Sequence, residues 1–286
     1  MRPRSIGAAL LAALGLTGCG VGQGAGEQST EALIQAIALA QTEYLVLDLA
    51  TGGLTTTTQV SDLGTNPTYR DQVMVFKAID AGLAVQGSAA SDFGHQADET
   101  ASAGSVPRYY IGVFEVTQAQ WVRLAGSGST PWTAITPASL TTVDGTRPAH
   151  GISLTLAQTM VGTASARLGH GLSLPSDAQW ERACHGGLSA TFAWGESRDE
   201  TVAESFARVA ETVSGQTGPF PVGRLAANGY GLYDVHGNVW ELTTTGALRG
   251  GSWRDSLSQA RCANRNTGVD QQTAYGLAGL RLVLTP

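Results

Sequence analysis

One stretch of thirteen residues, from Gly229 to Glu241, constrains the fold of this chain more than any other. It reads Gly-Tyr-Gly-Leu-Tyr-Asp-Val-His-Gly-Asn-Val-Trp-Glu. Its glycines interrupt any long helix or strand, whereas its aromatic and aliphatic side chains favour burial. Asp234 and Glu241 bracket two backbone turns, and two acids around a carbonyl-rich turn are typical ligands of a hard cation. The stretch therefore predicts a buried, irregular segment that can bind a cation.

The first eighteen residues have the pattern of a bacterial lipoprotein signal peptide. Two arginines precede an apolar segment, residues 6–16, that is too short to span a bilayer. The segment runs into Leu16-Thr17-Gly18-Cys19, which resembles a lipobox, and an ordinary secretory signal with a chance cysteine is the alternative. We expect a lipid on Cys19 and a flexible tether over residues 19–29. The protein would then be anchored to a membrane of the bacterial cell envelope, at the outer membrane or the cell surface.

The composition describes a globular chain with an excess of acidic residues. Hydrophobic residues make up 42% of the 286 residues and charged residues 14%, so the chain can bury a core. Loss of the signal peptide with its two arginines changes the formal net charge from −6 to −8. Because no basic cluster offsets this charge, we expect no nucleic-acid partner.

The region after the tether has the pattern of a helix followed by a hairpin. Apolar residues at helical spacing favour a helix over residues 30–41. Residues 43–49 alternate like a strand, and Thr51-Gly52-Gly53 supplies a turn before a threonine-rich return over residues 54–60. We assign residues 30–72 to an N-terminal extension of this form.

Three later segments begin with helix-capping residues, and the rest of the chain favours short strands and polar loops. A serine or threonine precedes each helix, and the third start also has the spacing of a capping box. The expected caps are Thr117, Ser153 or Thr155, and Ser176, and the helices end near Leu124, Gly169 and Gly186. Residues 88–107 have the composition of a surface loop. This pattern favours a loop-rich α+β domain with few short helices and strands.

Eight separated pieces of the chain together resemble one family. They follow the family's order with similar gaps, so the combination is far more specific than any single piece. They are YYIGVFEVTQAQW (109–121), LPSDAQWERACHGG (174–187), FAWG (192–195), PVG (221–223), GYGLYDVHGNVWE (229–241), LRGGSW (248–253), RCANR (261–265) and GLRLV (279–283). The family is that of the formylglycine-generating enzymes, or sulfatase-modifying factors. The resemblance implies a decorated variant of the C-type-lectin fold over residues 73–286.

Two cysteines are expected to form a disulfide. Once Cys19 carries lipid, Cys184 and Cys262 remain, and a pair in an oxidising compartment favours a disulfide over two buried thiols. The resemblance implies the same pairing, because both positions match cysteines that form a structural disulfide in family members.

The stretch from Gly229 to Glu241 matches a calcium loop of the family. The resemblance implies that the side chains of Asp234 and Glu241 and the carbonyls of Gly237 and Val239 hold one structural calcium ion. The residues also allow an alternative, in which Asp234 caps a turn and Glu241 pairs with an arginine. We expect calcium.

The copper site of the oxidase members is not expected in this chain. Its two thiolates would fall at Asp255 and Leu257, counted from the Gly-Gly-Ser turn and from Cys262. Neither residue is a cysteine, and Cu(I) requires soft ligands such as thiolates. We therefore expect no copper, no catalytic residues of the oxidase kind and no formylglycine-generating activity.

The C-terminal run also resembles the ligand-binding face of surface proteins that are diversified by retroelements. The residues between Trp253 and Gly279 are mostly polar, which suits an adaptable recognition surface and equally a generic solvated loop. The candidate ligand surface comprises Ser252, Trp253, Arg254, Asp255, Ser256, Gln259, Asn264 and Asn266. We expect an envelope lipoprotein that binds a protein or glycan. The alternative is an extracytoplasmic oxidoreductase that acts on a peptide or small molecule without the copper dithiolate.

Overall fold

The computed structural model describes residues 41–126, 128–135, 143–213, 215, 217–268 and 270–286. The predicted signal peptide, the lipid-carrying Cys19, the tether and the helix predicted over residues 30–41 lie outside the described part, apart from Gln41. No helix within the described ranges has the length and apolar character needed to cross a membrane.

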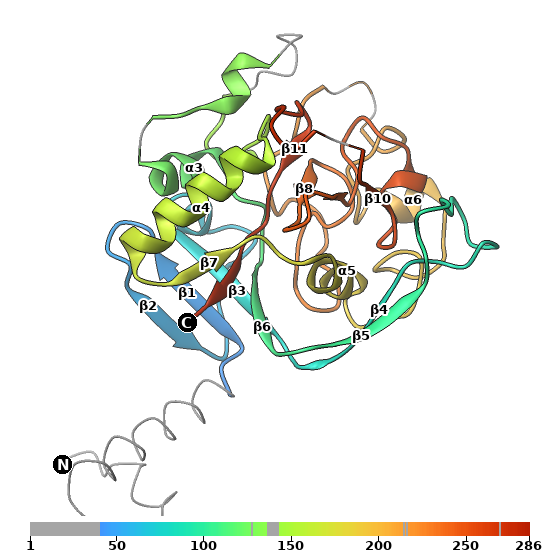
Figure 1. Cartoon of the computed structure of the whole chain (residues 1–286), viewed down its shortest axis with the longest axis horizontal. Coiled ribbons are helices and arrows are strands. Elements are labelled where there is room, and N and C mark those ends of the chain that lie inside the picture. The colour runs from blue at the N-terminus through green and yellow to red at the C-terminus, as the bar shows by residue number, and fades with distance from the viewer. Residues whose placement is uncertain (1–40, 127, 136–142, 214, 216, 269) are drawn as a thin grey trace, which may run out of the picture. The chain divides into compact units, whose positions relative to one another are not determined.

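The largest sheet has six strands, which come from both the early and the last parts of the described chain (Figure 1). In sheet order they are β2 (Leu54–Thr57), β1 (Tyr44–Asp48), β3 (Val73–Ile79), β6 (Tyr109–Gly112), β12 (Val283–Thr285) and β7 (Gly171–Ser173). Every neighbouring pair is antiparallel. The predicted hairpin is confirmed as β1 and β2, and the pairing of β1 with β3 makes it part of this sheet.

Two smaller sheets hold the remaining strands. One has four strands in the order β10 (Arg265–Asn266), β9 (Leu248–Arg249), β8 (Trp240–Leu242) and β11 (Ala278–Gly279). The other pairs β4 (Gly82–Gln86) with β5 (Ser102–Val106). The prediction that residues 88–107 form only a loop was wrong for β5. Because four of the five residues of β5 are exposed, this strand has no alternating apolar pattern to reveal it.

The three predicted helices are confirmed as α3 (Gln118–Ala125), α4 (Leu154–Leu168) and α5 (Asp177–His185). Thr117 and Ser176 each form a complete capping box, and Ser153 rather than Thr155 caps α4. The remaining short helices are α6 (Glu200–Ala203), η1 (Pro67–Arg70), η2 (Pro131–Ala134) and η4 (Leu257–Gln259). The described chain is therefore a loop-rich α+β domain, as predicted.

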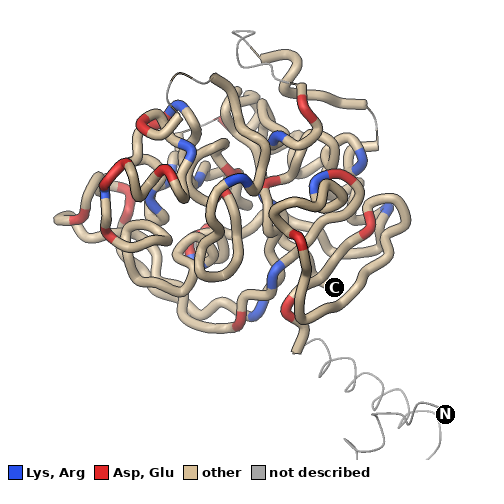
Figure 2. Tube along the Cα trace, turned by 180° about the vertical axis from the view of Figure 1, so that it is seen from behind, with Lys and Arg blue, Asp and Glu red and all other residues tan. Residues whose placement is uncertain are grey.

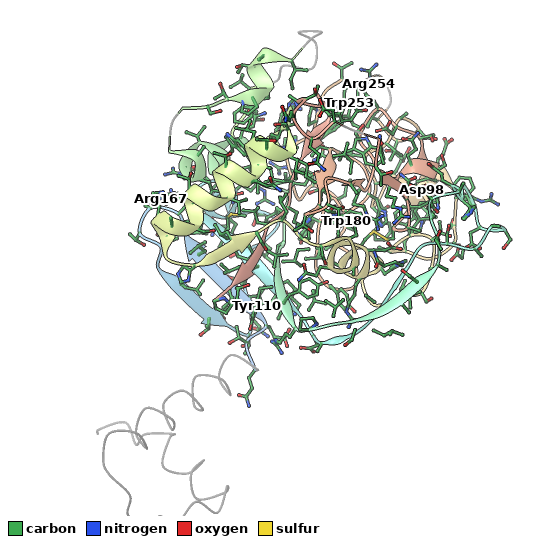
Figure 3. The ribbon with its side chains drawn as sticks, in the orientation of Figure 1. Asp98, Tyr110, Arg167, Trp180, Trp253 and Arg254 are labelled. Atoms are coloured by element: carbon green, nitrogen blue, oxygen red, sulfur yellow. A yellow bond between two sulfur atoms is a disulfide. The ribbon has the colours of Figure 1, made fainter. Side chains whose placement is uncertain are left out.

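The core joins the largest sheet to α5 and to the C-terminal loops. Ile111 of β6 and Val283 of β12 belong to one buried cluster with Trp180 of α5 and both cysteines. Trp180 is labelled near the centre of the side chains in Figure 3. Because this cluster includes parts of the segment from Gly229 to Glu241, the same core that stabilises the domain also positions the predicted calcium loop.

Candidate functional site

Glu241, at the end of the predicted calcium loop, is paired with an arginine. Arg281 donates from Nε and Nη2 to the Glu241 carboxylate at 2.6 to 3.1 Å, and both side chains are buried. Trp180 Nε1 donates to Oε2 of the same carboxylate at 2.6 Å. The other donors of Arg281 bind the carbonyls of Gly112, Val113 and Tyr233. Both oxygens of Glu241 are thus engaged by protein donors.

Two further acids lie buried beside this pair. Asp234 adopts a left-handed backbone conformation, with φ of 58°, and its Oδ2 accepts a hydrogen bond from the Gly223 amide at 2.6 Å. Glu115 accepts from Asn238 Nδ2 at 2.5 Å and from the Val239 amide at 3.2 Å. Burial raises the pKa of Asp234 to about 6, and burial with nearby Asp234 and Glu241 raises the pKa of Glu115 well above its ordinary value. The positive charge of Arg281 therefore acts on three buried acids: Glu115, Asp234 and Glu241.

The side chains predicted to bind calcium are only partly available for an ion. Glu241 would have to give up some of its contacts with Arg281 and Trp180, whereas the Asp234 carboxylate is held by one amide hydrogen bond. A cation beside Asp234 would favour the ionised carboxylates that burial disfavours. Calcium at this loop stays a prediction, and the arrangement also includes the arginine pairing that the residues allowed as the alternative.

The disulfide between Cys184 and Cys262 is confirmed, with a Cα–Cα distance of 5.6 Å. His236 lies beside it and is fixed by two hydrogen bonds: Nδ1 donates to the Ala260 carbonyl at 2.7 Å, and Nε2 accepts from the Ala193 amide at 3.1 Å. Burial lowers the pKa of His236 to about 4, so the ring is neutral at pH 7. These three are the single group of converging metal-ligand side chains within the described ranges, but the disulfide engages both sulfurs.

The two positions of the family's copper thiolates hold residues with structural contacts. The Asp255 carboxylate accepts from Trp240 Nε1 at 2.8 Å and from the Ser252 hydroxyl. Leu257 is buried in a cluster with Phe192, and its amide donates to the Glu211 carboxylate at 3.0 and 3.1 Å. A hydrogen-bonded carboxylate and a buried leucine therefore occupy the two positions that correspond to the thiolates of the oxidase members.

The candidate ligand surface is exposed only in part. Arg254 is exposed, and Asp255, Ser256, Gln259 and Asn266 are half-buried. The expectation was wrong for Ser252, Trp253 and Asn264, which are buried. The three are buried because Ser252 supports Asp255, Asn264 bonds Gln96 and Gln259, and the Trp253 ring lies beneath the Arg254 guanidinium. Figure 3 labels Arg254 beside Trp253 at the edge of the molecule.

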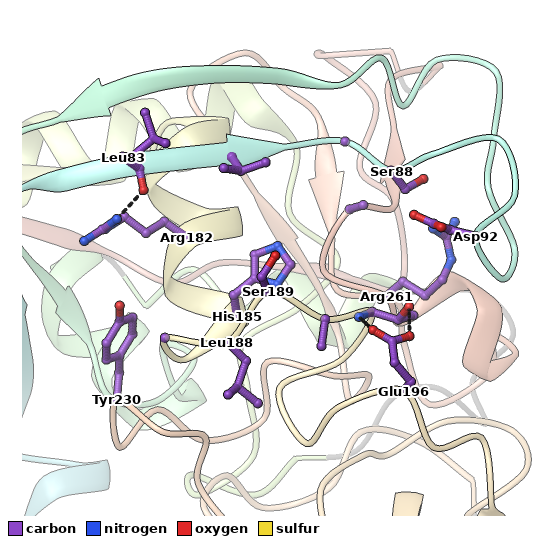
Figure 4. A pocket seen from close by; sticks show the side chains of 16 residues that line it. Leu83, Ser88, Asp92, Arg182, His185, Leu188, Ser189, Glu196, Tyr230 and Arg261 are labelled. Atoms are coloured by element: carbon purple, nitrogen blue, oxygen red, sulfur yellow. Dashed lines mark hydrogen bonds between the residues drawn. The ribbon is translucent and has the colours of Figure 1, made fainter.

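A pocket that the sequence did not predict lies between β4 and the C-terminal end of α5 (Figure 4). Its volume is about 510 Å³, within the usual range for a ligand site. Its lining includes Leu83, Val85, Asp92, Arg182, Leu188 and Glu196. Leu83 and Val85 are alternate residues of β4, and both are exposed. Ala84 between them is buried, so β4 directs its small apolar side chain inward and its two large ones toward solvent, which the sequence alone does not reveal.

The charges of the described chain are mixed in sign. Figure 2 shows acidic and basic residues interspersed along the trace. The most deeply buried basic residues are paired with acids: Arg249 with Glu181, Arg261 with Glu99 and Arg281 with Glu241. The chain as a whole has a formal net charge of −6.

Residues 60–286 match the family model of the Sulfatase-modifying factor enzyme 1-like domain. The formylglycine-generating enzyme of Mycobacterium tuberculosis is 44% identical over 82 residues, which cover 26% of this chain and 27% of that protein. The inactive C-alpha-formylglycine-generating enzyme 2 of Mus musculus is 35% identical over 101 residues, which cover 30% of this chain and 33% of that protein. The chain therefore spans about a quarter to a third of the length of these curated relatives.

Two solved structures share the fold at low sequence identity. Treponema denticola variable protein 1 superposes with a TM-score of 0.63 at 20% identity, covering 80% of this chain and 99% of that chain. PvdO from Pseudomonas aeruginosa superposes with a TM-score of 0.64 at 20% identity, covering 74% of this chain and 94% of that chain. At this identity the two likenesses concern the fold alone.

Proposed function

This chain belongs to the Sulfatase-modifying factor enzyme 1-like family, and from that membership we propose that it is a lipid-anchored envelope protein that recognises a protein or glycan. In this proposal the domain serves as a recognition scaffold and not as a formylglycine-generating oxidase. The recognition surface is the exposed part of the C-terminal run, formed by Arg254, Asp255, Ser256, Gln259 and Asn266.

The observation that carries the proposal is the set of contacts made by Asp255 and Leu257. Copper-dependent oxygen chemistry needs two soft thiolates. At the two corresponding positions, this chain has a carboxylate bound to Trp240 and a buried leucine. With Cys19 lipidated as proposed, no free thiol remains, because Cys184 and Cys262 form a disulfide. The mouse relative whose name marks it as inactive supports a role for this family apart from oxidation.

The contacts around Arg254 favour binding through a polar surface. The Asp255 carboxylate accepts hydrogen bonds from Trp240 and Ser252. The Arg254 guanidinium carbon lies over the buried Trp253 ring, 5.8 Å from the ring centroid. Recognition surfaces commonly combine rigid aromatic side chains with adaptable polar groups. The resemblance to retroelement-diversified surface proteins supports the same reading.

The lipid anchor and the calcium ion belong to this proposal as well. The lipobox-like sequence at Cys19 supports the anchor, and metabolic labelling with an alkyne fatty acid tests it: the full chain should be labelled and Cys19→Ser should not. Asp234, with Glu241 and the carbonyls of Gly237 and Val239, would hold one structural calcium ion.

Metal analysis and oxygen uptake of the purified protein test the proposal against the oxidoreductase alternative. We expect no stoichiometric copper or iron, and no oxygen consumption with cysteine-containing peptides. Stoichiometric copper or iron together with turnover would overturn the recognition role.

A further inference from the structure

We propose that the pocket between β4 and α5 binds an extended peptide segment of a partner protein, which pairs with the free edge of β4. This site is separate from the proposed recognition surface around Arg254 and does not depend on it. Three features of the pocket favour such a peptide: the edge of β4, the apolar side chains around it and the charges at its two ends.

The edge of β4 that faces α5 has one open position between two covered ones. Arg182 of α5 donates to the Leu83 carbonyl, and the Gly87 amide donates to Glu181 Oε1 at 2.7 Å. In an antiparallel pair, alternate residues direct both backbone groups away from the partner strand. Val85 lies midway between Leu83 and Gly87, so its amide and carbonyl face the same edge. Among the described residues, no hydrogen bond outside the β4–β5 ladder involves either of these two groups.

Apart from the two side-chain contacts from α5, this edge lacks the usual features that prevent strand addition. Natural edge strands are commonly protected by lysine, by proline or by a covering element. β4 reads Gly-Leu-Ala-Val-Gln and contains neither charge nor proline. Within the described ranges it pairs with β5 alone. An incoming strand could therefore bond Val85 without displacing any part of the sheet.

Exposed apolar side chains gather around the same edge. The described chain has six large hydrophobic side chains that are exposed, and three of them line this pocket. They are Leu83, Val85 and Leu188, with exposures of 62, 53 and 50%. Such clustering marks an interaction site, whereas single exposed hydrophobics are ordinary. A peptide with β-branched residues at alternate positions would cover these side chains while its backbone bonds Val85.

The charges of the pocket indicate what else the peptide carries. Figure 4 shows Arg182 at one end of the pocket, and Asp92 and Glu196 at the other. Arg261, also at the second end, is neutralised by Glu99, which accepts from Nη1 at 2.8 Å and from Nη2 at 2.5 Å. The exposed carboxylates of Asp92 and Glu196 thus favour a basic residue in the peptide at that end.

Fluorescence anisotropy with the full chain in detergent and a labelled, amidated hexapeptide, Val-Thr-Val-Thr-Val-Lys, tests the proposal. We expect saturable binding that weakens when glutamate replaces the peptide lysine and when salt is added. Val85→Pro removes the edge amide and Leu188→Ser removes the apolar wall, and each should weaken binding about tenfold. Val122→Ser is the control, because Val122 is an exposed hydrophobic residue of α3 outside the pocket. This variant should bind the peptide with the affinity of the wild type.

Three outcomes would overturn the proposal. The first is the absence of saturable binding. The second is equal binding by the wild type and Leu188→Ser, which decides the matter even if Val85→Pro fails to fold. The third is concentration-dependent self-association that Val85→Pro or Leu188→Ser abolishes, since a second copy of this chain would then occupy the edge. Because Arg254→Ala should leave peptide binding unchanged, failure of this site and failure of the Arg254 surface are distinguishable.

Discussion

Glu241 and Arg281 form a buried ion pair that joins the loop ending at Glu241 to the segment just before the last strand of the largest sheet. The pair is 40 residues apart in sequence, and Trp180 of α5 completes the hydrogen bonding of the carboxylate. Arg281 also binds three backbone carbonyls, so this single side chain holds β6, the calcium-like loop and the C-terminal segment together.

Replacing Glu241 with glutamine should lower the free energy of unfolding by about 3–5 kcal/mol, because it removes the one carboxylate that is hydrogen-bonded to the buried Arg281 guanidinium and leaves only the electrostatic influence of Asp234 and Glu115. Urea denaturation measures this loss. Glu241→Leu combined with Arg281→Met should cost less than the two single changes added together. Arg123→Ala removes an exposed pair with Asp71 and should cost no more than ~1 kcal/mol. Equal losses for Glu241→Gln and Arg123→Ala would contradict the account.

Calcium should stabilise the protein more at pH 7 than at pH 5. Without a cation, the pKa of Asp234 is raised from 3.8 to about 6, so its ionisation costs stability as the pH rises through that range. A bound calcium ion would favour the ionised form and so reverse this cost. At a concentration of a hundred times Kd, the gain is about 2.7 kcal/mol. Thermal melts at both pH values, with calcium and with chelator, measure it.

The double variant Asp234→Ala with Glu241→Ala is the control for calcium. It should melt at the same temperature with calcium and with chelator. If the wild type shows no calcium response, the loop is held by Arg281 alone.

Removal of the disulfide should destabilise the protein by about 4 kcal/mol in the chain-entropy model, since the bond closes a loop of 78 residues. Cys184→Ser with Cys262→Ser removes both thiols and avoids mispairing. The urea midpoint of this variant, compared with that of the wild type, gives the value. An unchanged midpoint would mean that packing alone fixes the two segments.

His236 should make the protein sensitive to acid. Its pKa falls from 6.5 in the unfolded chain to about 4 in the fold, so the unfolded state takes up the proton first. The stabilising effect of the neutral ring is therefore complete above pH 6.5 and is lost as the pH falls through about 4. His236→Phe keeps a buried ring and should flatten this part of the stability profile, at a cost of about 1–3 kcal/mol for the amide and carbonyl left unpaired. A profile that keeps the wild-type slope would assign the acid sensitivity to other groups.

The sequence predicted the elements that local chemistry determines. Thr117 and Ser176 define two helices through capping boxes, and the glycine turn after Asp48 defines the first hairpin. It did not predict β5, whose residues are small and exposed. Nor did it identify Arg281 as the partner of Glu241, because that contact forms only when distant segments pack together. For the same reason the burial of Ser252 and Asn264 could not be read from their polar side chains.

The most direct test of the recognition role is site-specific photo-cross-linking in intact cells. A photoreactive phenylalanine derivative replaces Arg254 in the full chain, and the same group replaces exposed Val122 as the matched control. We predict a discrete cross-linked product at position 254 that is absent at position 122. No product at position 254, or the same products at both positions, would contradict recognition through the C-terminal surface.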